Sequence, residues 1–124
     1  MTFINRIFGT FEQAPPKPTL NKRSSEWPKV EIAHLNLFPY CAVTGRLCFN
    51  VKTQKRILDC SVHHILPFHK FPELELIPTN LITLSEAGPW NAHFCFGHLL
   101  DWKSWNVDVV KMSSDFLNLI KNRP

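Results

Sequence analysis

The sequence has no long apolar run and no leader-like start. None of its apolar stretches approaches the roughly 20 residues needed to cross a bilayer, so no transmembrane helix is expected. Residues 1–6 lack a basic segment followed by an unbroken apolar stretch, which argues against a secretory signal. Internal repeats are missing too. A chain of 124 residues is therefore expected to form one domain in the cytoplasm, away from membranes.

Cysteine pairs with the spacing of a zinc site are also missing. The four cysteines, Cys41, Cys48, Cys60 and Cys95, form no CxxC pair, which is the usual mark of such a site. A chain of this length can build a sizeable core and does not need disulfides. We therefore expect reduced and mostly buried thiols.

What the sequence does have is a globular composition and a basic stretch. Hydrophobic residues make up 44% and charged residues 19%, which excludes wholesale disorder. The formal net charge is +4. Much of it lies within residues 46–70, where Asp59 is the one acid and the basic residues are Arg46, Lys52, Lys55, Arg56 and Lys70. This excess of positive charge is typical of a surface that contacts phosphates. The alternative interpretation is that these residues form the solvated rim of a hairpin.

The chain divides into an arm and a domain. Residues 12–23 are rich in proline and predict an extended linker, preceded by a short amphipathic helix within residues 3–11. Residues 1–26 are therefore assigned to an N-terminal arm and 27–124 to the domain. A helix is predicted from Ser25, as its cap, to about Leu37, and another from Asp108 to Asn122.

Between the two helices the pattern predicts strands and one short helix. The strands are expected over residues 47–51, 57–65 and 80–84, and the short helix runs from Asn91, as its cap, to about Leu99. The last helix carries an apolar stripe that is expected to belong to the core: Val109, Met112, Phe116 and Ile120.

Adjacent histidines in the long middle strand are the most informative feature. His63 and His64 would point to opposite faces of that strand, so they cannot share one role. Asn80 opens the next strand, and His93 lies in the predicted short helix. Such a β-β-α arrangement would bring distant segments together around one ion.

Six short motifs in this order resemble the HNH endonucleases of the His-Me finger group, also called ββα-metal nucleases. The resemblance covers about 27–124 and rests on Trp27-Pro-Lys-Val, Cys41-Ala-Val-Thr-Gly, Val62-His-His-Ile-Leu-Pro, Pro72-Glu-Leu-Glu-Leu, Asn80-Leu-Ile-Thr-Leu and His93-Phe-Cys-Phe-Gly-His. It implies an α+β fold with a ββα-metal core, flanked by an N-terminal and a C-terminal helix.

The resemblance also implies a role for each matching residue. His63 and His93 would bind one divalent ion, His64 would be the general base on water, and Asn80 would steady the loop and orient that base. His98 is kept only as an alternative metal ligand or phosphate contact. A second ligand on the same helix would fit better four residues after His93, and His98 lies five residues after it.

The implied activity is metal-dependent hydrolysis of phosphodiester bonds in DNA, double-stranded DNA being the expected partner. Mg²⁺ is the expected ion, with Mn²⁺ or another transition metal as the alternative. The basic residues within 46–70 would hold the DNA backbone without reading bases.

The sequence departs from the family at its structural zinc site. Many members bind this zinc with two cysteine pairs, but here the matching positions are Cys41 with Thr44 and Ser85 with Ala92. Tetrahedral zinc needs four ligands, so no structural zinc is expected. We expect aromatic residues, among them Trp90, Trp102 and Trp105, to fill that space by packing.

Two other functions stay open from the sequence. One is a non-catalytic nucleic-acid-binding module on a decayed nuclease fold, which the lost zinc cysteines favour slightly. The other is a small interaction or structural protein whose histidines are incidental. The sequence leaves several further points open: DNA or RNA preference, sequence specificity, nicking or double-strand cleavage, oligomeric state and biological role.

Overall fold

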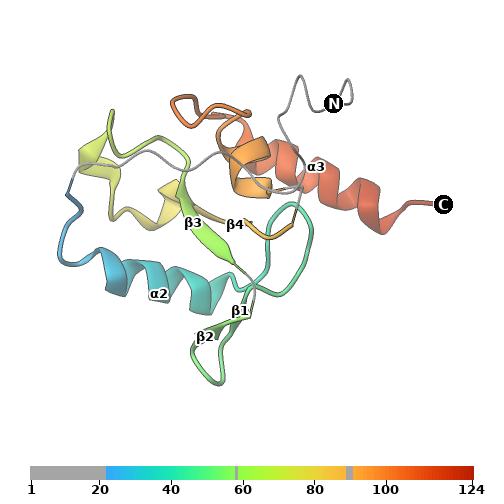
Figure 1. Cartoon of the computed structure of the whole chain (residues 1–124), viewed down its shortest axis with the longest axis horizontal. Coiled ribbons are helices and arrows are strands. Elements are labelled where there is room, and N and C mark those ends of the chain that lie inside the picture. The colour runs from blue at the N-terminus through green and yellow to red at the C-terminus, as the bar shows by residue number, and fades with distance from the viewer. Residues whose placement is uncertain (1–21, 58, 89–90) are drawn as a thin grey trace.

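Two helices enclose two small antiparallel hairpins in a computed structural model that describes residues 22–57, 59–88 and 91–124 (Figure 1). The predicted N-terminal helix and most of the linker lie outside these residues. The first elements in chain order are α2 (Trp27–Leu37), β1 (Phe49–Asn50), β2 (Lys55–Arg56) and β3 (Cys60–His64). The short 3-10 turns η1 (Pro72–Leu74) and η2 (Pro78–Asn80) follow, and then β4 (Leu81–Ser85), the π-helical turn η3 (His93–Gly97) and α3 (Val109–Lys121). The α+β class expected from the sequence is confirmed.

The β3–β4 hairpin is the centre of the molecule. Its strands pair in register, with His63 opposite Ile82 and His64 opposite Leu81. All five residues of β4 are buried, which suits its run of β-branched and leucine side chains. Figure 1 shows α2 along one side of this hairpin and α3 on the other. A core of buried residues joins these elements: Leu35, Cys41, Val43, Cys48, Phe49, Cys60, Val62, Leu81, Ile82, Leu84, Ala92 and Val109.

The strands are shorter than predicted. Residues 47–51 contain only β1, which pairs with β2 across a turn that Gln54 closes at φ 57°. That pairing places β2 at Lys55–Arg56, ahead of the predicted start at Ile57. The predicted strand 57–65 is therefore reduced to β3, and the strand predicted from Asn80 begins one residue later.

The helix starts differ in detail from the prediction. Ser25 does not cap α2; the hydroxyl of Ser24 accepts a hydrogen bond from the Glu26 amide instead. Asp108 does precede α3, but its side chain makes no capping bond. Instead, the side-chain oxygen of Asn106 accepts a bond from the Asp108 amide. The N-cap of η3 is Ala92 rather than the predicted Asn91, although the side-chain oxygen of Asn91 accepts a bond from the Phe94 amide in the first turn.

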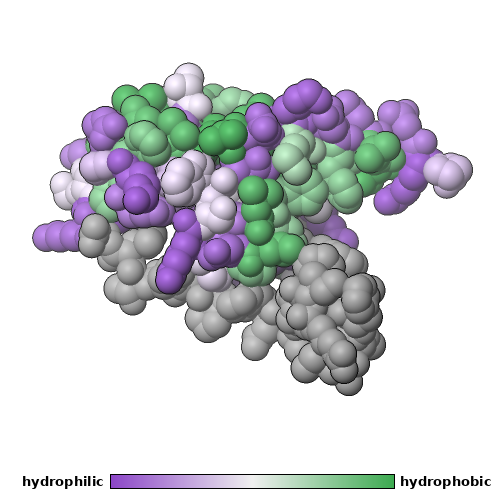
Figure 2. Space-filling model, turned by 90° about the horizontal axis from the view of Figure 1, so that it is seen from above, coloured by the Kyte–Doolittle hydropathy of each residue, from purple (hydrophilic) through white to green (hydrophobic). Residues whose placement is uncertain are grey.

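The apolar stripe of α3 is only partly core. Val109 is fully buried, but Met112 is 42% and Phe116 40% exposed. The prediction was wrong for these two because α3 extends away from the central hairpin (Figure 1). Phe116 packs on Phe96 of η3, with ring centroids 5.2 Å apart, but its other side stays open to solvent. Figure 2 shows apolar and polar residues side by side on one face of the molecule. None of the helices in the described ranges has the length and apolar character that a membrane crossing requires.

Candidate metal centre

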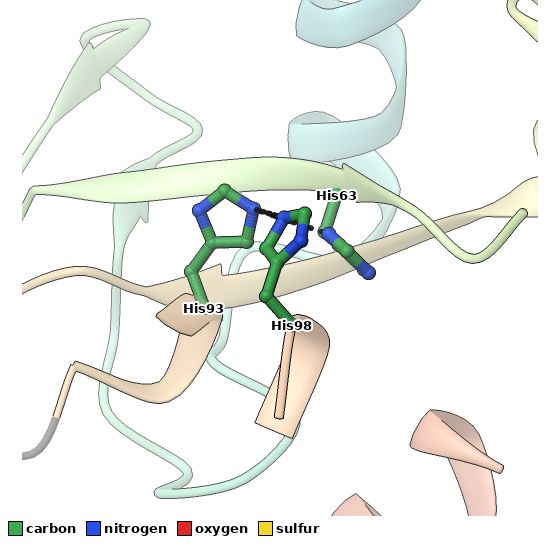
Figure 3. A group of neighbouring side chains, drawn as sticks. All are labelled: His63, His93 and His98. Carbon is green, nitrogen blue, oxygen red and sulfur yellow. Dashed lines mark hydrogen bonds between the residues drawn. The ribbon is translucent and has the colours of Figure 1, made fainter. Parts of the chain in front are cut away.

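Three histidines from two elements meet beside the central hairpin (Figure 3). His63 lies near the end of β3, His93 begins η3, and His98 directly follows it. The Nε2 atom of His93 lies 3.1 Å from Nδ1 of His63 and 3.1 Å from Nε2 of His98. One ligand nitrogen from each ring lies within 4.8 Å of the others, so the three could hold a metal ion.

The π-helical turn explains why His98 joins this cluster. Its backbone amide donates to the His93 carbonyl five residues back, at 3.1 Å. A π-helix repeats at a longer interval than an α-helix, so residues five apart lie on the same face of the turn. The sequence-based objection to His98 assumed α-helical geometry. The structure therefore brings together His63, His93 and His98.

Two acceptors fix the tautomers of the second and third rings. Nδ1 of His93 lies 3.0 Å from the Glu86 carboxylate, and Nδ1 of His98 lies 2.8 Å from the Ser104 carbonyl. Both oxygens can only accept, so each Nδ1 carries the proton. In the neutral rings, the Nε2 lone pairs of His93 and His98 then face each other at 3.1 Å. Two facing lone pairs repel unless a cation lies between them.

The spacing of the nitrogens also suits a metal ion. Two imidazole nitrogens bound to one transition metal at about 2.0–2.1 Å lie about 3.0–3.4 Å apart. The two separations that involve His93, 3.1 Å each, fall in this range, whereas the three nitrogens together span up to 4.8 Å. Metal-bound histidines generally donate their other ring N–H to a carboxylate or backbone carbonyl, as His93 and His98 do here. The donor set therefore fits a bound metal ion.

His63 is held in its neutral form. Burial lowers the pKa of its imidazole well below the ordinary value, and the neighbouring His93, His98 and His64 act in the same direction. Neutral imidazole is the form that binds metals. Its Nε2 atom is buried and has no hydrogen-bond partner in the described residues.

Gly97 allows η3 to approach His63 closely. A Cβ atom at this position would lie 3.0 Å from Cε1 of His63 and 3.1 Å from a methyl group of Leu84. Both neighbours are buried, so neither can move away easily. The absence of a side chain at Gly97 therefore lets the turn that carries two of the histidines pack against the third.

His64 faces the other way, as expected for adjacent residues in a strand. Its Nε2 atom donates to the Glu75 carbonyl at 2.8 Å, which leaves Nδ1 with the lone pair. Nδ1 accepts a hydrogen bond from the Arg23 guanidinium at 3.1 Å, and the ring packs on Trp27. Burial lowers the pKa of His64, and Arg23 lowers it further, against the opposing effect of Glu75. His64 is therefore neutral near pH 7.

Asn80 holds together the loop between the two strands. Its side-chain oxygen accepts a bond from the Leu66 amide at 2.9 Å, and its amide group donates to the carbonyls of Leu66 and Leu74. The next residue after Leu74 is Glu75, whose carbonyl binds His64. The side chain of Asn80 thus fixes the backbone that orients His64 without touching that ring.

A cavity of about 350 Å³ joins the two sets of histidines. Its walls include the three clustered rings and His64, together with residues from the loop after β3 and from the segment before α2. The lining residues are Arg23, Ser61, Val62, His63, His64, Pro67, Phe68, His69, His93, His98 and Trp102. A molecule bound in this cavity would contact both the three-histidine cluster and His64.

The five basic residues singled out from the sequence lie outside the cavity wall. Arg46, Lys52, Lys55 and Lys70 are exposed. Arg56 is instead engaged in the fold, since it pairs with Glu31 at 3.1 Å and donates to the Cys60 carbonyl. The only basic side chain in the wall, Arg23, falls in the segment predicted to be a linker, so sequence analysis missed it. Glu86 was missed too, and its only signal was its place directly after a strand.

The positions that the resemblance to HNH endonucleases assigns to a zinc site are joined by other contacts. All four cysteines are free thiols, and three of them are buried. The sulfur of Cys41 accepts a hydrogen bond from the Ser85 amide at 3.3 Å, so these two positions remain neighbours without a second thiolate. Trp102 packs against Phe94 and against the rings of His93 and His98.

Comparison of this chain with protein-family models, with curated proteins and with solved structures finds no match in any of the three. What the protein does therefore has to follow from the chemistry of its site.

Proposed function

We propose that this protein is a metal-dependent endonuclease that hydrolyses phosphodiester bonds in DNA. One observation carries the proposal: a three-histidine cluster and a separately oriented neutral histidine line the same cavity. Hydrolysis of a phosphodiester needs a base for the attacking water and positive charge at the phosphate. His64 would be the base, and an ion held by the three-histidine cluster would supply the positive charge. The two functions meet because His64 is adjacent to His63 in β3.

In this proposal β3, β4 and η3 form the ββα-metal core of a His-Me finger nuclease. The π-helical turn replaces the first turns of the core helix, and α2 and α3 are the flanking helices. Support comes from the order of these elements, from His63 in β3 and His93 in η3, and from Asn80, which directly precedes β4.

His64 is the proposed general base. The Glu75 carbonyl holds its Nε2–H, so the lone pair of Nδ1 faces the cavity side of the ring, where Arg23 now binds it. Burial lowers the pKa of His64, which keeps its imidazole neutral, and a neutral imidazole can accept a proton from water. Such a base typically accelerates the reaction 10²–10⁴-fold. The bonds of Asn80 to Leu66 and Leu74 keep the Glu75 backbone in place.

The metal ligands are His63, His93 and His98, with Glu86 and Ser104 orienting two of them. A divalent ion held there would act as a Lewis acid on the phosphate and on the departing oxygen. Three imidazole donors favour ions such as Zn²⁺ or Ni²⁺ over Mg²⁺, which prefers oxygen ligands. The donor set therefore moves our expectation from Mg²⁺ to a transition metal.

Double-stranded DNA is the proposed substrate. Exposed Arg46, Lys52, Lys55 and Lys70 would contact backbone phosphates without reading bases. Arg56 is removed from this set, because Glu31 already neutralises it.

Plasmid cleavage tests the proposal. The purified full chain is incubated with supercoiled plasmid and Zn²⁺, Ni²⁺, Mn²⁺ or Mg²⁺ in turn, and again with excess EDTA. We expect nicked or linear product with at least one ion and none with EDTA, while circular dichroism shows that the fold persists in EDTA. Retarded plasmid fragments in a gel shift, without cleavage under any ion, would instead support a non-catalytic binding module.

A further inference from the structure

Arg23 occupies the nitrogen that a general base must keep available. Its Nη1 lies 3.1 Å from Nδ1 of His64, and Nε2 of the same ring is already committed to the Glu75 carbonyl. Guanidinium can only donate, so Nδ1 accepts. In this state His64 has no free lone pair with which to take a proton from water.

The guanidinium is held in place by stacking on two rings. It lies 5.1 Å from the centroid of Trp27 and 5.0 Å from that of Phe68. The next residue along the chain is anchored as well, because the Ser24 amide donates to the Glu75 carboxylate at 3.1 and 3.3 Å. Glu75 therefore orients His64 through its carbonyl and anchors the Arg23 segment through its side chain.

The charge of Arg23 is poorly satisfied by a neutral imidazole. Burial lowers the pKa of the guanidinium, against the opposing effects of Glu75 and Glu31, but arginine stays protonated in proteins. Within the described ranges no carboxylate pairs with it directly. Arginine binds phosphate through two parallel hydrogen bonds, which are stronger than a single bond to a neutral nitrogen. A phosphodiester entering the cavity would therefore compete well for this side chain.

We propose that Arg23 caps His64 in the free protein and that a bound phosphodiester draws the guanidinium away, which frees Nδ1 for the attacking water. This proposal rests on the nuclease function proposed above. When a phosphate takes the guanidinium, water replaces it at Nδ1, and one O–H proton passes to that nitrogen as the water oxygen bonds to phosphorus. The P–O bond to the leaving group breaks in the same displacement, and the departing oxygen takes a proton from solvent water. Arg23 is thus a positioning residue whose contact changes with the substrate, and the base becomes active only when substrate is present.

Nitrogen NMR of the His64 ring tests the cap without any cleavage. The full chain, uniformly ¹⁵N-labelled and free of added metal, is compared with Arg23→Met and with Lys22→Met, which removes the same charge one residue earlier at an exposed position. We expect the Nδ1 resonance of His64 to move towards the unbonded position in Arg23→Met and to stay in place in Lys22→Met. Equal Nδ1 resonances in Arg23→Met and the unchanged protein would overturn the cap.

A titration of the unchanged protein with dimethyl phosphate needs no substitution, so it remains decisive if Arg23→Met fails to fold. We expect the same resonance to move in the direction seen for Arg23→Met, and an unmoved resonance at saturation would overturn the proposal. Arg23→Lys, which keeps the charge and a donor, should retain the capped resonance.

Plasmid cleavage separates this inference from the nuclease function. Arg23→Met should lower kcat/KM about 10- to 100-fold through the lost phosphate contact, and added guanidinium ion should restore part of it. Lys22→Met should cleave like the unchanged protein. If the protein cleaves plasmid but the Nδ1 resonance of His64 does not move, the capping of His64 by Arg23 is contradicted and the nuclease function is supported. If the Nδ1 resonance of His64 moves with dimethyl phosphate but the protein never cleaves plasmid, the phosphate-dependent contact of Arg23 is supported and the nuclease function is contradicted.

Discussion

His98 follows His93 by five residues, and the Nε2 atoms of the two rings lie 3.1 Å apart because the turn between them is π-helical. In an α-helix a separation of five residues would rotate the second ring well away from the first. The longer π repeat brings the two rings to one side, where His63 approaches from β3. A local irregularity of the helix thus creates the third ligand of the cluster.

Removing His98 should therefore weaken metal binding as much as removing His63 or His93. We expect His98→Ala to lower the affinity for Zn²⁺ by more than the 10- to 100-fold that loss of a supporting residue typically costs. Isothermal titration calorimetry measures this directly. His69→Ala serves as the control, because this exposed histidine stacks on Trp105 and lies outside the cluster. Equal zinc affinities in His98→Ala and the unchanged protein would limit the site to two histidines.

Glu86 should set the strength of the site through His93. Its carboxylate accepts the Nδ1–H of that ring at 3.0 Å, which fixes the tautomer and raises the basicity of Nε2. We expect Glu86→Gln to lower the metal affinity about 10- to 100-fold with the fold intact. Glu73→Gln, an equal change at an exposed position, should leave the affinity unchanged. A similar loss in both variants would indicate a general charge effect instead.

Loss of His64 should stop cleavage and leave metal binding in place. Its ring points away from the cluster and towards Glu75, so His64→Ala removes the base without removing a ligand. The expected loss of kcat is about 10²–10⁴-fold. Zinc affinity, a gel shift with plasmid fragments and the circular dichroism spectrum should change little. Cleavage by His64→Ala within about threefold of the unchanged protein would assign the base elsewhere.

Sequence periodicity was enough to predict both long helices and the two strands of the central hairpin. The α+β class and the roles of His63, His64, Asn80 and His93 were expected from the resemblance to HNH endonucleases, while strand geometry alone predicted that His63 and His64 face opposite ways. The sequence could not place His98, since the α-helical repeat puts residues five apart on different faces, whereas the turn in the structure is π-helical. Arg23 was missed because its contact with His64 joins residues 41 positions apart.

Asn80 should stabilise the fold as well as orient the base. Its buried side chain makes three hydrogen bonds that tie the end of β3 to the loop before β4. Asn80→Ala leaves the Leu66 amide and two carbonyls without these partners, and each buried group left unsatisfied costs about 1–3 kcal/mol. We expect the free energy of unfolding in urea to fall by at least about 2 kcal/mol. Asn118→Ala, at an exposed site of α3, should change it by less than about 0.5 kcal/mol.

Buried histidines should make the protein less stable in mild acid, and His34 isolates this effect from the site. It lies in α2, is 7% exposed, and its Nε2 has no partner in the described residues. Burial lowers the pKa of His34 in the folded state, whereas in the unfolded chain it is about 6.5. As the pH falls through about 6.5 the unfolded state takes up the proton first, so the free energy of unfolding decreases with falling pH.

Substitution by leucine should remove this contribution. Urea unfolding of the metal-free protein between about pH 8 and pH 5 gives the slope of stability against pH, to which one histidine contributes up to about 1.4 kcal/mol per pH unit. We expect a smaller slope in His34→Leu than in the unchanged protein, with the remainder due to His63 and His64, whose pKa values burial also lowers. His69→Leu, the same change at an exposed histidine, is the matched control. A slope in His34→Leu equal to that of His69→Leu would show that His34 takes up its proton equally well in the folded state.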